Sequence, residues 1–301
     1  MKNTDTTIKK SGLGAKSSRI ISNTIIYIIL VLMTCVWLFP FFGILLESFR
    51  VENTWQVDYF MPKQFGFDNY IKLTTYKDGI FIKWYTNTLI MGVATAVLQT
   101  FFVLSMSYTL SRLRFKGRKL LMNCMLVLGM FPGFLTMILI FKVFADLKIF
   151  GETGLTAGMA PVGLIIVYCA SSGMGYYVSK GFFDTIPKSL DEAARVDGAT
   201  RWQVFYKVIM PMSKPIVIYT ILMGFMAPWG DFMFARYMAR GAAAGQNVAV
   251  GMWGLLDKTM INYHYTMFCA AGVVVAVPVT IVFLALQKYY VEGVTGGAVK
   301  G

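Results

Sequence analysis

The sequence predicts an all-α, polytopic membrane protein with six transmembrane helices. Several runs of uncharged, mainly apolar residues are longer than the roughly 18 residues that indicate a membrane helix. Only 14% of the 301 residues are charged and 56% are hydrophobic, whereas about a quarter of the residues in soluble domains are charged. The third observation is that the segments between the apolar runs alternate between strongly basic and nearly neutral.

The first predicted span is Ile20–Leu46, which follows a polar, basic lead at residues 1–19. Its 27 uncharged residues are too many for the apolar region of a signal peptide, which has about 7–15. We therefore predict an uncleaved membrane helix, which Pro40 is expected to kink or end.

Five further apolar runs supply the remaining spans. They are Trp84–Ser111, Leu120–Phe141, Thr153–Ser179, Pro215–Gly230 and Thr259–Leu286. Pro132-Gly133 lies in the middle of the third span. The fourth is rich in glycine, and small residues allow membrane helices to pack closely.

The distribution of lysine and arginine predicts that both chain termini are cytoplasmic. The lead carries five basic residues, residues 112–119 carry five, residues 180–214 carry six and the tail at 287–301 carries two. The three other loops are nearly balanced in charge. Because the positive charges adjoin apolar spans, the net charge of +13 indicates membrane orientation and not nucleic-acid binding.

The spans contain no convergent set of titratable residues such as an enzyme would need. The metalloprotease, nucleophile-elbow and phosphate-loop motifs are missing from the sequence. We predict no enzymatic activity, no metal site and no cofactor bound by this chain, which cannot bind ATP by itself. The one histidine, His264, is expected to be an ordinary interfacial residue. The scarcity of intramembrane charge argues against a self-powered pump.

A few polar residues in the spans have two possible roles, which stay open. Asp231 is expected to be an acid at the outer end of span five. Four neutral residues either line a sugar path or bond to neighbouring helices: Asn87, Gln99, Asn123 and Thr136.

Residues 184–211 are predicted to form a compact helical hairpin between spans four and five. Ser189 and Glu192 fit a capping box, and Gly198 can adopt the left-handed conformation that ends a helix. Thr200 and Gln203 fit a second capping box. The spacing therefore predicts a short helix, a glycine turn and a second short helix.

Two faces of this hairpin are apolar in pattern. Leu190, Ala193 and Ala194 share a helical face whose small residues would allow a partner to approach closely. Trp202, Phe205 and residues 208–209 form a stripe that is expected to pack against the bundle. Spacing alone leaves two alternatives, a docking site for a partner or a linker with ordinary caps.

The hairpin resembles the EAA loop of the membrane subunits of ATP-binding-cassette (ABC) importers, whose pattern is Glu-Ala-Ala-x3-Gly-x9-Ile-x-Leu-Pro. The matching residues are Glu192, Ala193, Ala194, Gly198, Val208, Ile209, Met210 and Pro211. Val208 replaces Ile and Met210 replaces Leu. The stretch from Gly181 to Pro215 resembles the carbohydrate branch of these permeases. The ending Val291–Gly301 resembles the tail of the smaller maltose/maltodextrin permease subunit.

The resemblance implies a type I ABC importer permease fold and assigns a role to each of the matched residues. Residues 20–286 would be the permease domain, and the coupling helix would sit in a groove of an ATPase subunit. Its contact and shape-setting residues would be Glu192, Ala193, Ala194, Asp197, Gly198 and Pro211. The tail would form a second ATPase contact through Gly297, Ala298, Val299, Lys300 and Gly301.

The resemblance also implies the partners of the chain. They are a second homologous permease subunit, two copies of a cytoplasmic ATPase that holds ATP and Mg, an extracytoplasmic solute-binding protein, an oligosaccharide and the lipid of a bacterial cytoplasmic membrane. The loop Arg240–Asn247 would enter the sugar site of the binding protein.

The expected function is therefore import of malto-oligosaccharides or related sugars, driven by ATP hydrolysis in partner subunits. The alternatives are a permease for another oligosaccharide, a polysaccharide fragment or glycerol phosphate, or a stand-alone membrane channel. No residue is assigned to substrate binding, because the EAA pattern faces the ATPase and not the cargo.

Overall fold

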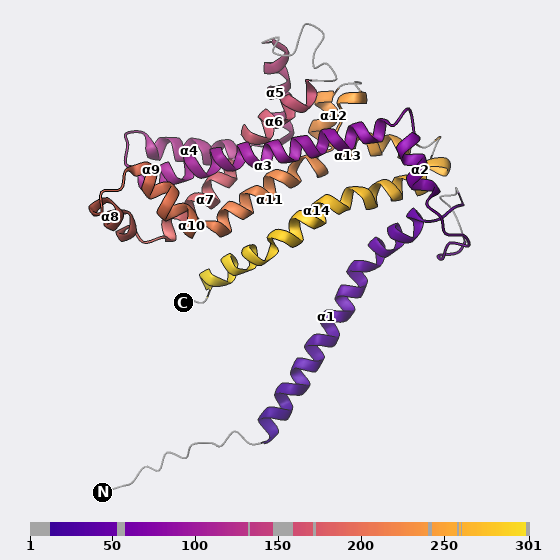
Figure 1. The fold of residues 1–301 in the computed structure, drawn as a ribbon, viewed down its shortest axis with the longest axis horizontal. Helices are drawn as coiled ribbons and strands as arrows, with labels where there is room; N and C mark the ends of the chain where they lie inside the picture. Colours follow the sequence, from indigo (N-terminus) through magenta and orange to yellow (C-terminus); the bar gives the residue numbers. More distant parts are fainter. Residues whose placement is uncertain are drawn as a thin grey trace.

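The computed structural model describes residues 13–52, 58–131, 133–146, 159–170, 173–239, 243–257, 259 and 261–298. Within these ranges the chain is helical and contains no strand, and one isolated antiparallel bridge joins Arg50 to Phe65. The prediction of an all-α protein is confirmed. Figure 1 shows an elongated bundle of helices with one long helix, α1, standing apart from the rest.

Among the residues that the structure describes, three continuous helices are long and apolar enough to cross a membrane. They are α1 (Leu13–Ser48), α3 (Ile80–Arg112) and α14 (Ile261–Ala298). α1 packs on α14 near its own C-terminal end and then diverges from the bundle, so that the most apolar part of α1 buries no residue (Figure 1). Pro40 lies inside α1 and does not end it.

Two further candidate spans are bent pairs of helices. α6 (Ala160–Ala170) and α7 (Gly173–Thr185) form a pair bent by 42°. The segment Arg201–Met212 and helix α11 (Lys214–Gly230) form a pair bent by 83°. Counting each pair as one span gives five candidates among the described residues.

The third predicted span is divided into two shorter helices. α4 (Arg118–Gly129) ends shortly before Pro132-Gly133, and α5 (Gly133–Asp146) begins after the proline. A proline removes a backbone donor and disturbs the preceding turn, which accounts for the division of the predicted span. Residues 153–158 of the fourth predicted span lie outside the described residues, and a total of six spans stays a prediction.

Short elements gather at the two opposite ends of α3 (Figure 1). The α2 end of the bundle carries α2 (Asp68–Thr75), α12 (Met233–Ala239), η2 (Ala243–Gly245), α13 (Val248–Trp253) and η3 (Gly254–Leu256). The α8 end carries α8 (Ser189–Val196), α9 (Arg201–Gln203), the π-helix η1 (Val204–Ile209) and α10 (Met210–Met212).

α3 is the central helix of the bundle, and it packs against α11, α7 and α6. At the α2 end, Trp84 and Trp229 anchor an apolar cluster contributed by α2, α3, α11, α13 and α14. Gly251 of α13 lies directly on the Trp84 indole, where a Cβ atom would overlap the ring. The cluster at the α8 end consists of Leu104, Tyr108, Phe183, Ile186, Val204, Ile209 and Ile216.

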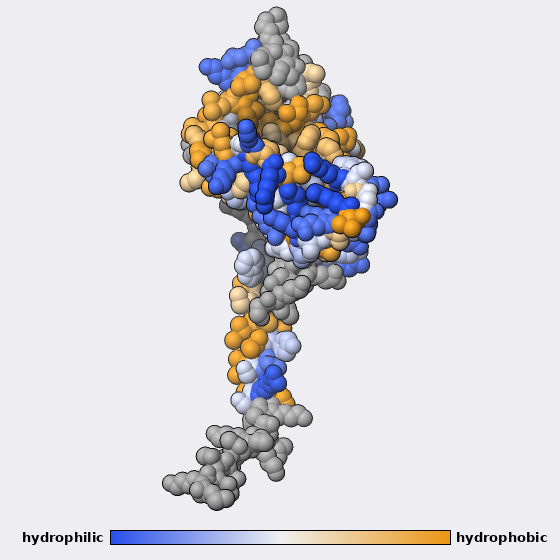
Figure 2. Space-filling model, turned by 90° about the vertical axis from the view of Figure 1, so that its left-hand side faces the viewer, coloured by the Kyte–Doolittle hydropathy of each residue, from blue (hydrophilic) through white to orange (hydrophobic). Residues whose placement is uncertain are grey.

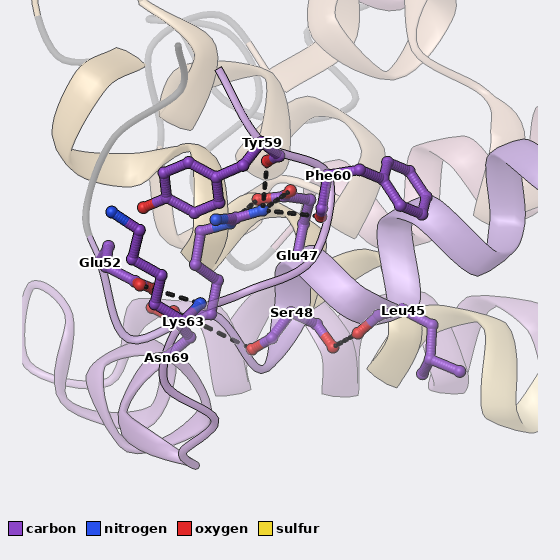
Figure 3. A network of polar contacts seen from close by, with 9 residues as sticks. Leu45, Glu47, Ser48, Glu52, Tyr59, Phe60, Lys63 and Asn69 are labelled. Atoms are coloured by element: carbon purple, nitrogen blue, oxygen red, sulfur yellow. Dashed lines mark hydrogen bonds and ion pairs between the residues drawn. The ribbon is translucent and has the colours of Figure 1, made fainter. Parts of the chain in front are cut away.

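A buried arginine fixes the end of α1. The Arg50 side chain is fully buried and donates 2.8 Å hydrogen bonds from Nε and Nη2 to the two carboxylate oxygens of Glu47 (Figure 3). Nη2 also donates to the Phe60 carbonyl at 3.0 Å. The hydrogen bond with Glu47 raises the pKa of Arg50 further above its ordinary value, so this guanidinium is permanently charged.

Asn69 of α2 extends the same network to the last helix. Its Nδ2 donates to the carbonyls of Ser48 at 3.1 Å and Arg50 at 2.7 Å (Figure 3). Its Oδ1 accepts a 2.9 Å hydrogen bond from Thr266 of α14. Because buried polar groups are costly unless paired, this buried amide with its three hydrogen bonds fixes the relative positions of α1, α2 and α14.

The two chain ends differ in part from the expected lead and tail. α1 begins at Leu13, within the predicted lead, and residues 1–12 lie outside the described residues. α14 continues through residues 287–298 of the predicted tail as one helix with the last span.

Candidate functional site

The turn after α8 has the geometry predicted for the glycine of the hairpin. Asp197 is the C-cap, and Gly198 has a φ of +85°. The Gly198 amide donates to Arg195 O at 3.0 Å and the Ala199 amide to Ala194 O at 2.9 Å, the two bonds of a Schellman motif. A Cβ on Gly198 would meet no atom within 4 Å, so the backbone conformation, and not space, requires a glycine here.

One of the two predicted capping boxes is confirmed. The Thr200 amide donates to Gln203 Oε1 at 2.7 Å, and the Gln203 amide donates to Thr200 Oγ1 at 3.3 Å. The capping box predicted at Ser189 is wrong, because Lys188 and not Ser189 occupies the N-cap position of α8. Lys188 has helical dihedral angles and makes no side-chain cap. Carbonyls of residues 187 and 188 accept the first amides of α8 and so replace the side-chain cap.

The prediction that Leu190, Ala193 and Ala194 form one partner face of α8 is wrong in part, because these side chains point in different directions. Leu190 and Ala194 pack against the apolar cluster at the α8 end. Ala193 is exposed together with Glu192. Val196 and Asp197 extend this outward surface, and Val196 has 88% of its area exposed. Figure 2 views this end of the molecule, where hydrophilic residues gather over the lower part of the bundle and hydrophobic residues cover much of its upper part.

Asp191 faces inward and is 6% exposed. Its Oδ2 lies 3.2 Å from Nε of Arg112, the last residue of α3, and the two side chains are 8% and 2% exposed. Arg112 Nη2 also donates to the Ile186 carbonyl at 2.8 Å. α8 is therefore tied to α3 by a buried ion pair that sequence spacing did not reveal.

The neighbouring residue of α3 holds the other side of the same segment. Ser111 Oγ donates to Asp184 Oδ1 at 2.6 Å, and Lys180 Nζ donates to Asp184 Oδ2 at 2.5 Å. Ser111 therefore holds the end of α7 through Asp184, and Arg112 holds α8 through Asp191.

The second limb of the hairpin packs on the bundle through most of the predicted stripe. Ile209 is fully buried, and the Phe205 ring packs against Tyr108 at a tilt of 48°, with ring centroids 4.7 Å apart. Trp202 is wrong as a member of the buried stripe, because 64% of its surface is exposed. Its ring lies beside Phe205, with ring centroids 5.5 Å apart.

Pro211 follows the π-helix η1 and lies exposed in α10. A proline cannot donate to the carbonyl four residues earlier, and its ring crowds that carbonyl. The wider π turn relieves this conflict. The chain then bends by 83° between α10 and α11, and a role for Pro211 in this shape stays a prediction.

Two of the polar residues with open roles are bonded within the chain at the α2 end. Asp231 caps the end of α11 and accepts from Tyr168 Oη at 2.6 Å and from the Phe234 amide at 3.1 Å. Asn87 Nδ2 donates to the carbonyls of Ala244 at 2.8 Å and Gln246 at 3.2 Å. Both residues therefore bond to neighbouring segments.

Part of the loop that would enter a sugar site lies against α3. Trp84 Nε1 donates to the Ala243 carbonyl at 2.8 Å, and Asn87 holds the following residues as described above. Residues 240–242 lie outside the described residues. Of the tail residues, Gly297 and Ala298 belong to α14, and residues 299–301 lie outside the described range.

The described residues contain no group of three or more His, Cys, Asp and Glu side chains that could hold a metal ion. The hairpin is instead a structural unit with one face fixed to α3 and the other exposed. It can transmit a contact, and nothing in its side chains is arranged for bond-making chemistry.

Comparison with known proteins identifies the family of the chain. Residues 103–296 match the family described as binding-protein-dependent transport system inner membrane component. The chain belongs to this family. The matched region contains the whole hairpin and the ion pair that holds it. Membership of this family makes the chain a permease subunit of a transport system that works with a binding protein.

Curated relatives resemble the permease over most of its length. It is 32% identical to the galactooligosaccharides transport system permease protein GanQ of Bacillus subtilis, over 91% of this chain and 94% of that protein. It is 29% identical to the maltodextrin transport system permease protein MdxG of B. subtilis, over 96% and 100%. It is 35% identical to the maltose/maltodextrin transport system permease protein MalG of Vibrio vulnificus, over 73% of each chain.

A solved structure confirms the ABC importer permease fold. The permease superposes on a chain of a bacterial ABC transporter involved in the import of the acidic polysaccharide alginate, with a TM-score of 0.73. The superposition covers 91% of this chain and 98% of that one at 22% identity. At this identity the match speaks for the fold alone.

Proposed function

We propose that the permease is a transmembrane subunit of an ATP-driven importer of oligosaccharides. The observation that carries the proposal is the difference between the two sides of α8. One side buries Asp191 against Arg112, and the other exposes Glu192 and Ala193. A short helix that is rigidly attached on one side and open on the other is suited to receive a partner. In a chain of this family, the partner we propose is a cytoplasmic ATPase subunit.

The proposed coupling is mechanical. ATP and Mg bind in the two ATPase subunits, whose closure displaces α8 through Glu192, Ala193 and the turn at Asp197 and Gly198. α8 moves with α3 and α11, and the bundle passes from inward-facing to outward-facing by rigid-body rotation. Pro211 keeps the angle between the hairpin and α11. This chain contributes shape and stiffness, and the chemistry takes place in the partner.

The proposed assembly places the α8 end and both termini in the cytoplasm of a bacterium. A second, homologous permease completes the translocation path, and a solute-binding protein docks on the α2 end. Residues 1–19 form the lead, 20–286 the six-span domain and 287–301 the tail. Because α14 runs on to Ala298, residues 297–301 can reach an ATPase beyond the membrane surface, and their deletion should lower coupled ATP hydrolysis.

The proposed cargo is a malto-oligosaccharide, with a galacto-oligosaccharide as the second candidate. The first follows from maltodextrin and maltose/maltodextrin permeases that are 29% and 35% identical to this chain. The second follows from the galactooligosaccharide permease, which is 32% identical over 91% of this chain.

Reconstitution tests the proposal. The permease would be purified with the proteins that accompany it and placed in liposomes, with ATP hydrolysis and sugar accumulation measured together. Maltotriose or galactotriose, delivered with the binding protein, should stimulate hydrolysis, and glycerol phosphate should not. Sugar flux through the purified chain alone, independent of ATP, would show a stand-alone channel instead.

A further inference from the structure

A basic pocket of about 550 Å³ lies at the turn between α3 and α4, away from the exposed face of α8. Its wall contains the cationic side chains of Arg114, Arg118 and Lys119. Phe115, Leu120 and Met122 supply its apolar part. No role in the proposed coupling of α8 requires this pocket.

The charge of the pocket is poorly balanced by the surrounding protein. Residues 112–119 contain five basic residues and no acid. The two carboxylates of the adjoining segments are already engaged, Asp191 by Arg112 and Asp184 by Lys180 and Ser111. Arg118 is close enough to Asp184 for an electrostatic attraction between the two charges. Even so, Nε of Arg118 is buried and has no hydrogen-bond partner among the described residues. The pocket therefore favours an anion.

The backbone at the pocket adds to this positive field. Gly117, with a φ of +90°, precedes α4 and offers no side-chain cap, and the first turn of α4 carries no acid. The amides at the start of a helix lack intrahelical partners, and the helix dipole makes this end positive. These contributions strengthen the field that the three cations create.

The apolar surface beside the pocket indicates what kind of anion fits. None of the twelve residues of α4 is buried, and Leu120 is 69% exposed at the pocket itself. Farther along the helix, Val127 and Leu128 are 55% and 68% exposed. A phosphate bound at the cations would thus lie at the head of a helix whose exposed residues are mainly apolar. A small soluble anion would leave this apolar surface uncovered, whereas a lipid has acyl chains to cover it.

We propose that this pocket binds the headgroup of an anionic phospholipid, with the acyl chains lying along α4. The phosphate accepts hydrogen bonds from Arg114, Arg118 and Lys119. The assignment follows the general rule that basic pockets at the membrane surface, between transmembrane helices, bind acidic lipid headgroups. It concerns a surface apart from the exposed face of α8 and does not depend on which sugar is carried.

Lipid retention tests the proposal. The full-length permease, with the subunits that co-purify, would be reconstituted with phosphatidylglycerol and phosphatidylethanolamine, extracted in mild detergent and examined by native mass spectrometry. The test variant is Arg114→Gln/Lys119→Gln. The control, Lys63→Gln/Lys83→Gln, removes the same charge at the other end of the bundle. Phosphatidylglycerol retention by the test variant should fall about 30-fold, at roughly fivefold per cation removed.

Three results would overturn the proposal. The first is equal phosphatidylglycerol retention by the test and control variants. The second is equal retention of the two lipids by the unaltered protein. The third is full displacement of the bound lipid by millimolar inorganic phosphate, which would assign the pocket to a soluble anion. Correct folding of the test variant is checked by its size-exclusion profile and by its wild-type retention of phosphatidylethanolamine.

Discussion

Arg112 at the end of α3 and Asp191 in α8 form an ion pair in which Nε and Oδ2 are 3.2 Å apart and both side chains are buried. Their neighbours Ser111 and Asp184 are joined as well. The α8 hairpin is thus attached to the central helix at two points. In this arrangement, adjacent residues of α8 have separate tasks, because Asp191 attaches the helix and Glu192 is left open to a partner.

Asp191→Leu should destabilise the permease. A buried ion pair that loses one partner costs about 3–5 kcal/mol, because the remaining charge is left unpaired. The thermal unfolding temperature in detergent should fall accordingly. In the double variant Arg112→Met/Asp191→Leu, which removes both charges, most of the loss should be recovered. An unchanged unfolding temperature in the single variant would show that the pair does not hold α8.

Glu192→Lys should leave stability unchanged and abolish uptake. The Glu192 side chain is exposed and has no hydrogen bond or ion pair within the described part of the chain, so a cation there harms only the partner contact. Uptake in transport-deficient cells and unfolding of the purified chain would be measured together. Asp58→Lys, the same charge change at an exposed site of the α2 end, serves as control. Normal uptake by Glu192→Lys would remove the case for α8 as the coupling helix.

Gly198→Val should also abolish uptake while the protein remains in the membrane. A residue with a Cβ pays about 1–2 kcal/mol in the left-handed conformation, and a β-branched residue is a pronounced outlier there. Gly181→Val is the matched control, since Gly181 has open space around it and no positive φ. Uptake and membrane content, determined by immunoblotting, distinguish the two. Equal transport by both variants would contradict a role for the turn.

Gly251→Ala should destabilise the α2 end. The added methyl group overlaps the Trp84 ring, and displacement of the indole breaks its hydrogen bond to Ala243. Overpacking of this kind costs about 1–3 kcal/mol. Gly254→Ala, with no atom within 4 Å of its Cβ, should be neutral in thermal unfolding. If Gly251→Ala unfolded at the wild-type temperature, the loop would not be locked on α3 as described.

The sequence predicted those features that depend on neighbouring residues. The Gly198 turn and the Thr200–Gln203 box are local, since a positive φ and a capping box each involve a few consecutive residues. The long apolar helices were predictable because a membrane span has a strict requirement for length and polarity. The motif Glu192-Ala193-Ala194 then indicated a family, which the match of residues 103–296 confirmed.

The features that the sequence did not predict depend on distant contacts. An eight-residue helix is too short for its apolar pattern to define a buried face, so the inward direction of Asp191 follows from Arg112 on another helix. The cap expected at Ser189 was replaced by carbonyls of the preceding turn. The exposure of Trp202, at 64% of its surface, likewise depends on how the hairpin packs against the other helices.

The position of α3 has a consequence for communication across the membrane. Its 33 residues span about 50 Å at 1.5 Å per residue. Trp84 and Asn87, near its first turn, hold the backbone of the loop at the α2 end, while Ser111 and Arg112 hold the hairpin. A continuous helix resists compression along its axis. A displacement of the loop at the α2 end is therefore transmitted through α3 to the hairpin, and the reverse. In the proposed assembly, docking outside and nucleotide binding inside are thereby reciprocal events.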